Sequence, residues 1–131
     1  MTTTYFLNCI MGNVFQTAVD PALPTTVYLG FSSTEPSIDG TGVTEPSGNG
    51  YARVQLTDLS EPSNGVITNS NDISFDDSTG SWGTIAYFVL YDAESDGNLL
   101  MYEALTKSRS VEEGMVVTVR SGSLNLVLAN S

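Results

Sequence analysis

After residue 24 the chain alternates between short strand-type runs and clusters of turn residues. The runs are rich in Val, Ile, Tyr, Phe and Thr, and Gly, Pro, Ser, Asn and Asp separate them at roughly even spacing. The first group favours strands and the second favours turns. The predicted strands are 25–33, 51–57, 66–68, 73–75, 83–91, 98–105, 115–120 and 124–129. This pattern of about eight strands predicts an all-β antiparallel sandwich or barrel, jelly-roll-like, forming a single domain over residues 25–131.

Two of the runs are apolar on both faces. They are GTIAYFVLY (83–91) and NLLMYEAL (98–105), and strands buried on both sides have this composition. We therefore expect both in the centre of a sheet, with Trp82 anchoring the core and its ring N–H hydrogen-bonded. The side chains expected to be largely buried are Ile85, Phe88, Leu90, Leu100 and Tyr102. The long connection 35–50, rich in Gly, Pro, Ser and Thr, is a candidate partner-binding loop.

Residues 1–24 are predicted to form a helix and a connector. Apolar side chains recur at helical spacing over 2–16, and Thr2, Thr3 or Thr4 can cap the first turn. Prolines at 21 and 24 exclude a longer helix.

One stripe of this helix is a candidate interface. Phe6, Ile10 and Val14 lie on it, with Leu7, Met11 and Phe15 beside it, and the segment carries almost no charge. An apolar face of this size requires a cover. The domain's own sheet, a neighbouring subunit or the surface of a larger assembly would each serve, so we take Phe6, Ile10 and Val14 as candidate partner-interface residues.

Residues 92–103, DAESDGNLLMYE, match most positions of a calcium-binding EF-hand loop. An EF-hand needs a helix on each side, but both flanking runs are strand-like. Asp96-Gly97 is typical of a hairpin turn, which would place Glu103 too far along the next strand to complete a ligand shell. We predict a hairpin and no metal site, and keep Asp92, Glu94 and Asp96 as a weak calcium candidate.

The sequence lacks the residues of most catalytic sites. It has no histidine and one cysteine, Cys9, which excludes Ser-His-Asp and Cys-His catalysis and cysteine-based zinc sites. Acidic pairs remain, as at 76–77 and 112–113, but neighbouring residues on a strand point to opposite faces. We therefore predict no enzymatic activity, no catalytic residues and no cofactor.

Charge and hydropathy limit the partners. Fifteen acidic residues against four basic ones give a net charge of −11, which predicts that nucleic acid is not a partner. No apolar run is long enough to span a membrane, the N-terminus lacks the features of a secretory signal, and the single cysteine fits synthesis in a reducing cytoplasm. Among the basic residues, Arg53 shares a strand face with Tyr51. We expect it to pair with a loop carboxylate, and it is also a candidate interface residue.

Several short motifs are spread over residues 25–129. They are Gly50-Tyr51-Ala52-Arg53, Thr68-Asn69 before Ile73-Ser74-Phe75, Ser81-Trp82-Gly83-Thr84, Tyr91-Asp92-Ala93, Gly97-Asn98-Leu99-Leu100, Ala104-Leu105-Thr106 and Gly122-Ser123-Leu124. Together they resemble a family of small structural proteins of tailed bacteriophages. Members of that family have been described as capsid decoration, or cement, proteins and as tail-fibre proteins.

This resemblance implies a non-enzymatic virion protein. It implies first that the protein lies on the capsid surface, where it decorates and stabilises the outer shell. The partners would then be the major capsid protein and further copies of the chain. A homotrimer is the first expectation and a homodimer the second. The alternative is a tail-fibre or baseplate-associated adhesion module. A calcium-dependent or carbohydrate-binding domain is a third hypothesis.

Overall fold

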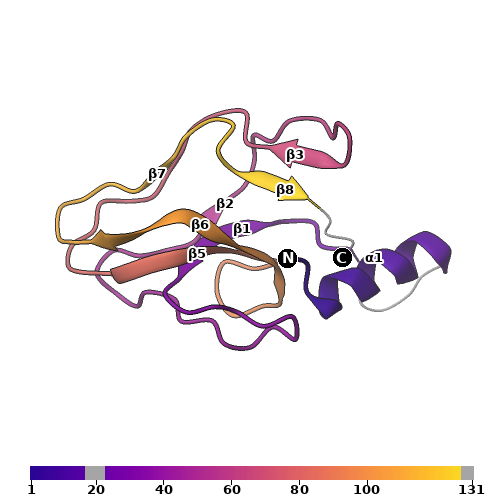
Figure 1. Ribbon diagram of the computed structural model, residues 1–131, viewed down its shortest axis with the longest axis horizontal. Coiled ribbons are helices and arrows are strands. Elements are labelled where there is room, and N and C mark those ends of the chain that lie inside the picture. The colour runs from indigo at the N-terminus through magenta and orange to yellow at the C-terminus, as the bar shows by residue number, and fades with distance from the viewer. Residues whose placement is uncertain (17–22, 128–131) are drawn as a thin grey trace.

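The computed structural model describes residues 1–16 and 23–127, which contain one helix and eight strands (Figure 1). The elements are α1 (Thr4–Phe15), β1 (Tyr28–Ser32), β2 (Val54–Gln55), β3 (Val66–Thr68), β4 (Ile73–Ser74), β5 (Gly83–Tyr91), β6 (Leu99–Val111), β7 (Thr118–Val119) and β8 (Asn125–Val127). Part of the predicted connector, 17–22, and the end of the last predicted strand, 128–129, lie outside the described residues.

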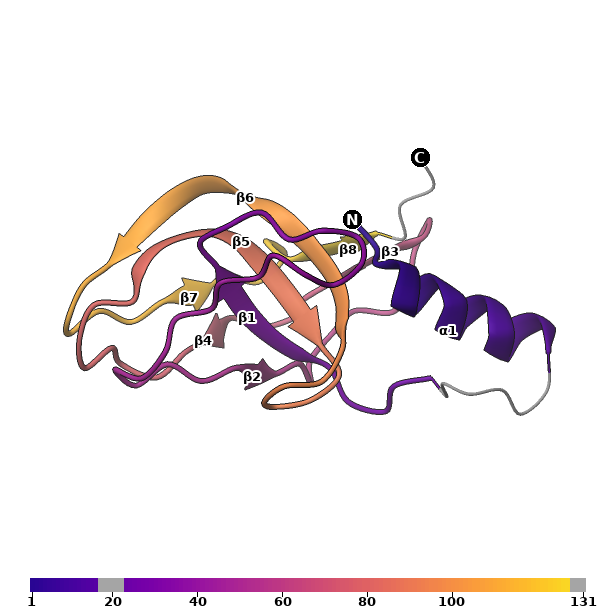
Figure 2. The ribbon, with the colours of Figure 1, turned by 90° about the horizontal axis from the view of Figure 1, so that it is seen from below.

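The strands form a sandwich-like arrangement of antiparallel sheets. A four-stranded sheet has the order β2-β1-β5-β6, and β3 pairs with β8 and β4 with β7. The described strands do not close into a barrel, and the two short pairs face the larger sheet (Figures 1 and 2). The predicted all-β fold with one N-terminal helix is confirmed in its sandwich form.

The main core lies between the four-stranded sheet and the short strand pairs. Its aromatic centre consists of Phe31, Phe75 and Trp82, which are 1%, 3% and 6% exposed. The Trp82 ring N–H donates to the backbone oxygen of Asn49 at 2.8 Å, as its polar edge requires. Ile85, Leu90, Leu100 and Tyr102 are buried as predicted, whereas Phe88 is only half-buried and packs at the margin of the core.

The 35–50 loop covers the other face of the four-stranded sheet. Val43 from this loop packs against a second buried cluster, made of Val89, Tyr91, Leu99 and Tyr102. In Figure 2 the loop passes over β5 and β6. This cover explains why the 83–91 run is apolar on both faces, and β5 does lie between two other strands. The loop therefore has a packing role; its predicted role in binding a partner stays a prediction.

β6 differs from its predicted form in position and length. It lies at the edge of the sheet, and residues 1–3 flank the outer side of its first half. Thr3 N donates to Leu100 O, and Tyr102 N donates to Met1 O, each at 3.0 Å. This extra backbone pairing gives the first half of β6 a central-strand environment. β6 then continues past residue 105 to Val111 through an irregular register opposite Ile85–Tyr87.

α1 begins where the sequence offers a cap and runs to Phe15. Thr3 Oγ1 accepts a hydrogen bond from Phe6 N at 3.3 Å, and the same hydroxyl lies 2.7 Å from Leu99 O. Thr3 therefore caps the helix and attaches it to β6. Gly12 does not end the helix early, and α1 extends away from the sheets (Figure 2). No helix in residues 1–16 or 23–127 is long and apolar enough to cross a membrane.

Candidate functional site

The two candidate sites are the exposed face of α1 and the polar cluster around Arg53. On α1, Cys9 is fully buried, and Tyr5 and Phe6 pack against the core. The opposite face carries four exposed apolar side chains, which we call the α1 seam. They are Leu7, Met11, Val14 and Phe15, which are 39%, 56%, 63% and 73% exposed.

The predicted interface stripe therefore divides between two environments. Phe6 packs against the core, Ile10 is half-buried and Val14 is exposed. Because α1 is apolar around most of its circumference, the sequence alone does not show which side meets the sheet. The contacts of Thr3 with β6 set that rotation. Whether Phe6, Ile10 and Val14 bind a partner stays a prediction.

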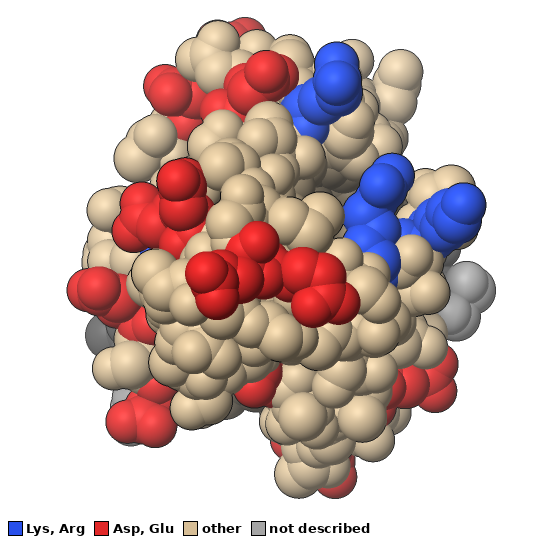
Figure 3. Space-filling model, turned by 90° about the vertical axis from the view of Figure 1, so that its left-hand side faces the viewer, with Lys and Arg blue, Asp and Glu red and all other residues tan. Residues whose placement is uncertain are grey.

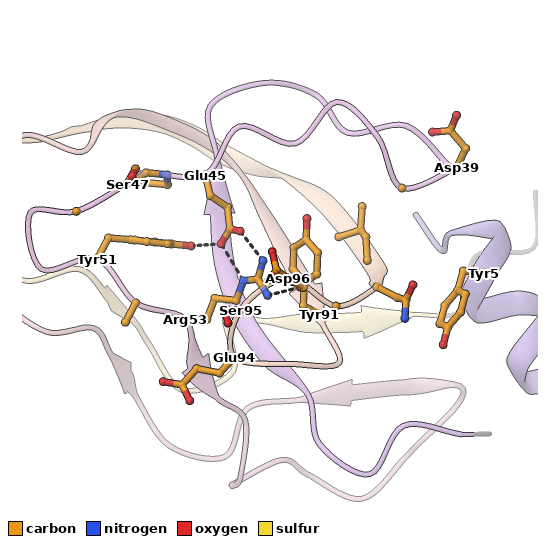
Figure 4. Close-up of a pocket in the computed structure, with 17 residues that line it drawn as sticks. Tyr5, Asp39, Glu45, Ser47, Tyr51, Arg53, Tyr91, Glu94, Ser95 and Asp96 are labelled. Carbon is orange, nitrogen blue, oxygen red and sulfur yellow. Dashed lines mark hydrogen bonds and ion pairs between the residues drawn. The ribbon is translucent and has the colours of Figure 1, made fainter. Parts of the chain in front are cut away.

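The Arg53 cluster consists of Glu45, Tyr51, Arg53 and Tyr91 (Figure 4). Arg53 Nε lies 3.0 Å from Glu45 Oε2, and Arg53 Nη2 lies 2.6 Å from Glu45 Oε1. The predicted pairing of Arg53 with a loop carboxylate is thus confirmed, in the bidentate form that arginine favours. The guanidinium carbon lies 3.6 Å from the centre of the Tyr91 ring, a cation–π contact.

Arg53 joins three segments of the chain. It holds Glu45 of the 35–50 loop, and its Nη1 donates to the backbone oxygens of Ala93 and Asp96 at 2.9 and 2.8 Å. Its side chain is only 7% exposed. Because four of its five N–H donors are engaged within the chain, Arg53 acts here as a cross-link between the loop and the β5–β6 turn. Its predicted contact with a partner stays a prediction.

The Arg53 cluster packs against β1 through Tyr51 and Gly30. The Tyr51 hydroxyl donates to Glu45 Oε2 at 2.6 Å and accepts from Phe31 N at 3.0 Å. A Cβ at Gly30 would lie 2.5 Å from Tyr51 Oη and 2.8 Å from Glu45 Oε2. A side chain at that position is therefore excluded while the cluster keeps this geometry.

The environment of the cluster keeps Tyr51 and Arg53 in the protonation states that their hydrogen bonds require. Burial raises the pKa of Tyr51, and its hydrogen bond to Glu45 and the charge of Glu45 raise it further. Burial lowers the pKa of Arg53, but the hydrogen bond and charge of Glu45 more than offset this, so the pKa is raised. Tyr51 therefore stays a neutral donor and Arg53 a cation, which suits a permanent structural contact.

An open groove of about 710 Å³ lies beside the cluster, between the 35–50 loop and the β5–β6 turn. Figure 4 shows Tyr5 and Asp39 at one end of the groove and Tyr51 at the other. Asp39, Glu94 and Asp96 are exposed and contribute acidic groups to its lining. The groove therefore presents mainly acidic groups, and the one cation in its lining, Arg53, is already paired with Glu45.

The 92–103 segment is a hairpin, as predicted. Residues 92–98 connect β5 to β6, so the connection is longer than a two-residue turn, although Asp96 and Gly97 have the positive φ angles, 54° and 76°, that a turn favours. The Asp92 carboxylate accepts from Asn98 N at 2.7 Å and from Asn98 Nδ2 at 3.2 Å. Glu103 instead contacts the amino group of Met1 at 2.6 Å. Within residues 1–16 and 23–127, no three acidic or cysteine side chains are placed to hold a metal ion.

We predict that calcium has no effect on stability through this turn. Asp92→Ala should lower the melting temperature slightly, because it removes the acceptor for Asn98 N. The loss should be equal in chelator and in excess calcium, and Asp92→Asn should recover part of it by restoring an acceptor. Differential scanning calorimetry is the measurement. A calcium-dependent rise in the melting temperature of the wild type that is missing in Asp92→Ala would show that the turn binds the ion.

The exposed charges are mostly acidic. Among the described residues, the ion pairs are Arg53–Glu45 and Met1–Glu103. The other basic residues, Lys107, Arg109 and Arg120, are exposed. Figure 3 shows basic side chains gathered at one edge of the face opposite α1, with acidic side chains spread over much of the rest. α1 itself carries no charged residue.

The described residues thus form an all-β domain with an internally hydrogen-bonded polar cluster and a projecting apolar helix. The chain matches the model of a protein family described as Podophage GP4 fiber I protein gp80, over residues 1–127. It therefore belongs to that family, and is a virion-associated phage structural protein of the fibre type. No curated protein matches it. The family supports the predicted phage structural class, and it favours the tail-fibre alternative over capsid decoration.

Proposed function

We propose that the chain is a non-enzymatic component of the phage tail-fibre apparatus that binds neighbouring virion proteins. The match to a fibre-protein family over residues 1–127 is the observation that carries this proposal. Capsid decoration, which the sequence resemblance implied first, becomes the competing hypothesis.

The fold suits such a role because its loops are cross-linked to its sheet. Arg53 holds the 35–50 loop and the β5–β6 turn together through Glu45 and two backbone oxygens. The same loop packs on the sheet through Val43. These contacts hold the loops against the sheet, which suits a structural role.

α1 is the element best suited to attachment. It projects from the sheets, and four of its apolar side chains are exposed (Figure 2). Apolar surface of this kind marks sites of protein contact. We therefore assign attachment to the α1 end of the molecule and leave the opposite end, with its mixed charges, facing outward.

The number of copies per particle distinguishes a tail location from a capsid location. Quantitative mass spectrometry of purified particles gives the ratio of this chain to the major capsid protein. A fibre component should be present at a small fraction of the major capsid protein, because a particle has one tail and many capsid subunits. A ratio close to that of a shell-covering protein would contradict the proposal and support capsid decoration.

A further inference from the structure

The spacing of the α1 seam is that of a helix-pairing surface. Leu7, Met11 and Val14 are separated by four and then three residues, and Phe15 flanks them. This alternation follows the 3.5-residue repeat along which two helices pack. At 100° per residue the three side chains lie within one narrow stripe, directly opposite the buried Cys9. The partner that fits this stripe is another helix with an apolar stripe of its own.

The charge of the chain favours a second copy as that partner. The net charge is −11, so most surfaces of two copies repel one another. α1 is an exception, because none of its twelve residues is charged. Two copies of α1 can therefore meet without placing like charges in contact, and each supplies the apolar stripe that the other requires.

We propose that α1 of one copy packs against α1 of another through Leu7, Met11, Val14 and Phe15. A contact in which the same surface of two copies meets is isologous and closes as a twofold dimer. The helix is only about 18 Å long, so association is expected to depend on concentration. This inference rests on the proposed attachment through the α1 end and names a second copy of the chain as the partner there, but it does not depend on where the chain lies in the particle.

A charge placed in the middle of the seam tests this contact in the full-length chain. Met11 lies midway along the seam, so Met11→Glu places acidic groups near each other in a parallel or an antiparallel pair. Val116→Glu is the matched control, because Val116 is 53% exposed against 56% for Met11 and lies outside α1. Deleting residues 1–16 is a poorer test, since it also removes the pairing of residues 1–3 with β6.

Sedimentation velocity and light scattering give the mass of each variant. The wild type and Val116→Glu should form an oligomer, whereas Met11→Glu should shift to the 13.9 kDa monomer with an unchanged circular dichroism spectrum. An oligomer whose mass Met11→Glu leaves unchanged would overturn the proposal. A monomeric wild type would also overturn it, and loss of Met11→Glu from particles would then assign the seam to a different virion protein.

Cross-linking locates the contact directly. Met11→Cys treated with a short bis-maleimide should give a covalent dimer, because the two substituted residues face each other in the seam. The native Cys9 is fully buried and provides an unreactive background. Val116→Cys should remain monomeric under the same conditions. Equal cross-linking of the two variants would indicate random collision and contradict a defined α1 contact.

Discussion

Replacing Trp82 by alanine should lower the free energy of unfolding by about 3–5 kcal/mol. The ring is 6% exposed, packs edge-on against Tyr51 with centroids 5.2 Å apart, and donates its N–H to Asn49 O. The substitution leaves a cavity and removes one of the two hydrogen bonds that Asn49 O accepts, the other coming from Thr79 N, so the cavity accounts for most of the loss. Urea denaturation followed by far-ultraviolet circular dichroism measures it, since the variant has no tryptophan fluorescence.

Two further variants separate the causes of that loss. Trp82→Phe keeps an aromatic side chain but removes the N–H, so its loss should be smaller. Val116→Ala, at an exposed apolar position, should change stability by no more than about 0.5 kcal/mol. If Trp82→Ala were as stable as Val116→Ala, the core would lie elsewhere in the molecule.

The second large effect is expected at the Arg53–Glu45 pair. Glu45→Leu leaves the Arg53 cation, whose side chain is 7% exposed, without its carboxylate. Removing one member of a buried ion pair typically costs about 3–5 kcal/mol, because the remaining charge stays desolvated. The Tyr51 hydroxyl loses its acceptor in the same variant. Denaturant unfolding gives the change in the free energy of unfolding.

A double variant tests whether the lost free energy of unfolding comes from the unpaired charge of Arg53. Glu45→Leu combined with Arg53→Met removes both charges, so the double variant should be more stable than the sum of the two single losses predicts. Glu103→Gln is the exposed comparison, because its pair with the Met1 amino group is about half exposed on both sides. That variant should lose less than about 1 kcal/mol. Strict additivity at positions 45 and 53 would show that the two side chains are not coupled.

The sequence alone was sufficient to predict those elements whose structure is determined by a local pattern of residues. The central strand β5 follows from its long apolar run, and the existence of the β5–β6 hairpin follows from Asp96-Gly97, although its connection, 92–98, is longer than a two-residue turn. The helix and its threonine cap follow from apolar spacing and the preference for hydroxyl residues at a helix start. Each of these features depends on neighbours in the chain.

The sequence alone did not predict the strand lengths and burial that depend on contacts between distant segments of the chain. β6 reaches Val111 although Thr106–Ser110 show no apolar alternation, because the backbone pairing with β5 continues there. β2 and β7 are two residues each, shorter than their apolar runs, because only those residues meet a partner strand. Phe88 is less buried than Val89 and Leu90, which follow it, because it packs only against the margin of the core, which no local pattern reveals.

The candidate sites were likewise predictable only in part from the sequence. The pairing of Arg53 with a loop carboxylate was predictable from its alternation with Tyr51, but the identity of Glu45 was not, because the 35–50 loop has no regular pattern. The exposed side of α1 was also undetermined, since apolar residues occur on most of its faces. The contacts of Thr3 with β6 leave Met11 exposed and bury Cys9.

Labelling the chain on intact particles shows whether it lies on the tail or on the head. An epitope tag at the exposed Glu112–Gly114 turn, at the end opposite α1, allows gold-conjugated antibody to be seen by electron microscopy. A tail-fibre component predicts label confined to the tail, with none over the head, and tagged protein that still enters particles at the wild-type level. Label distributed over the capsid surface would contradict the account and identify the chain as a decoration protein.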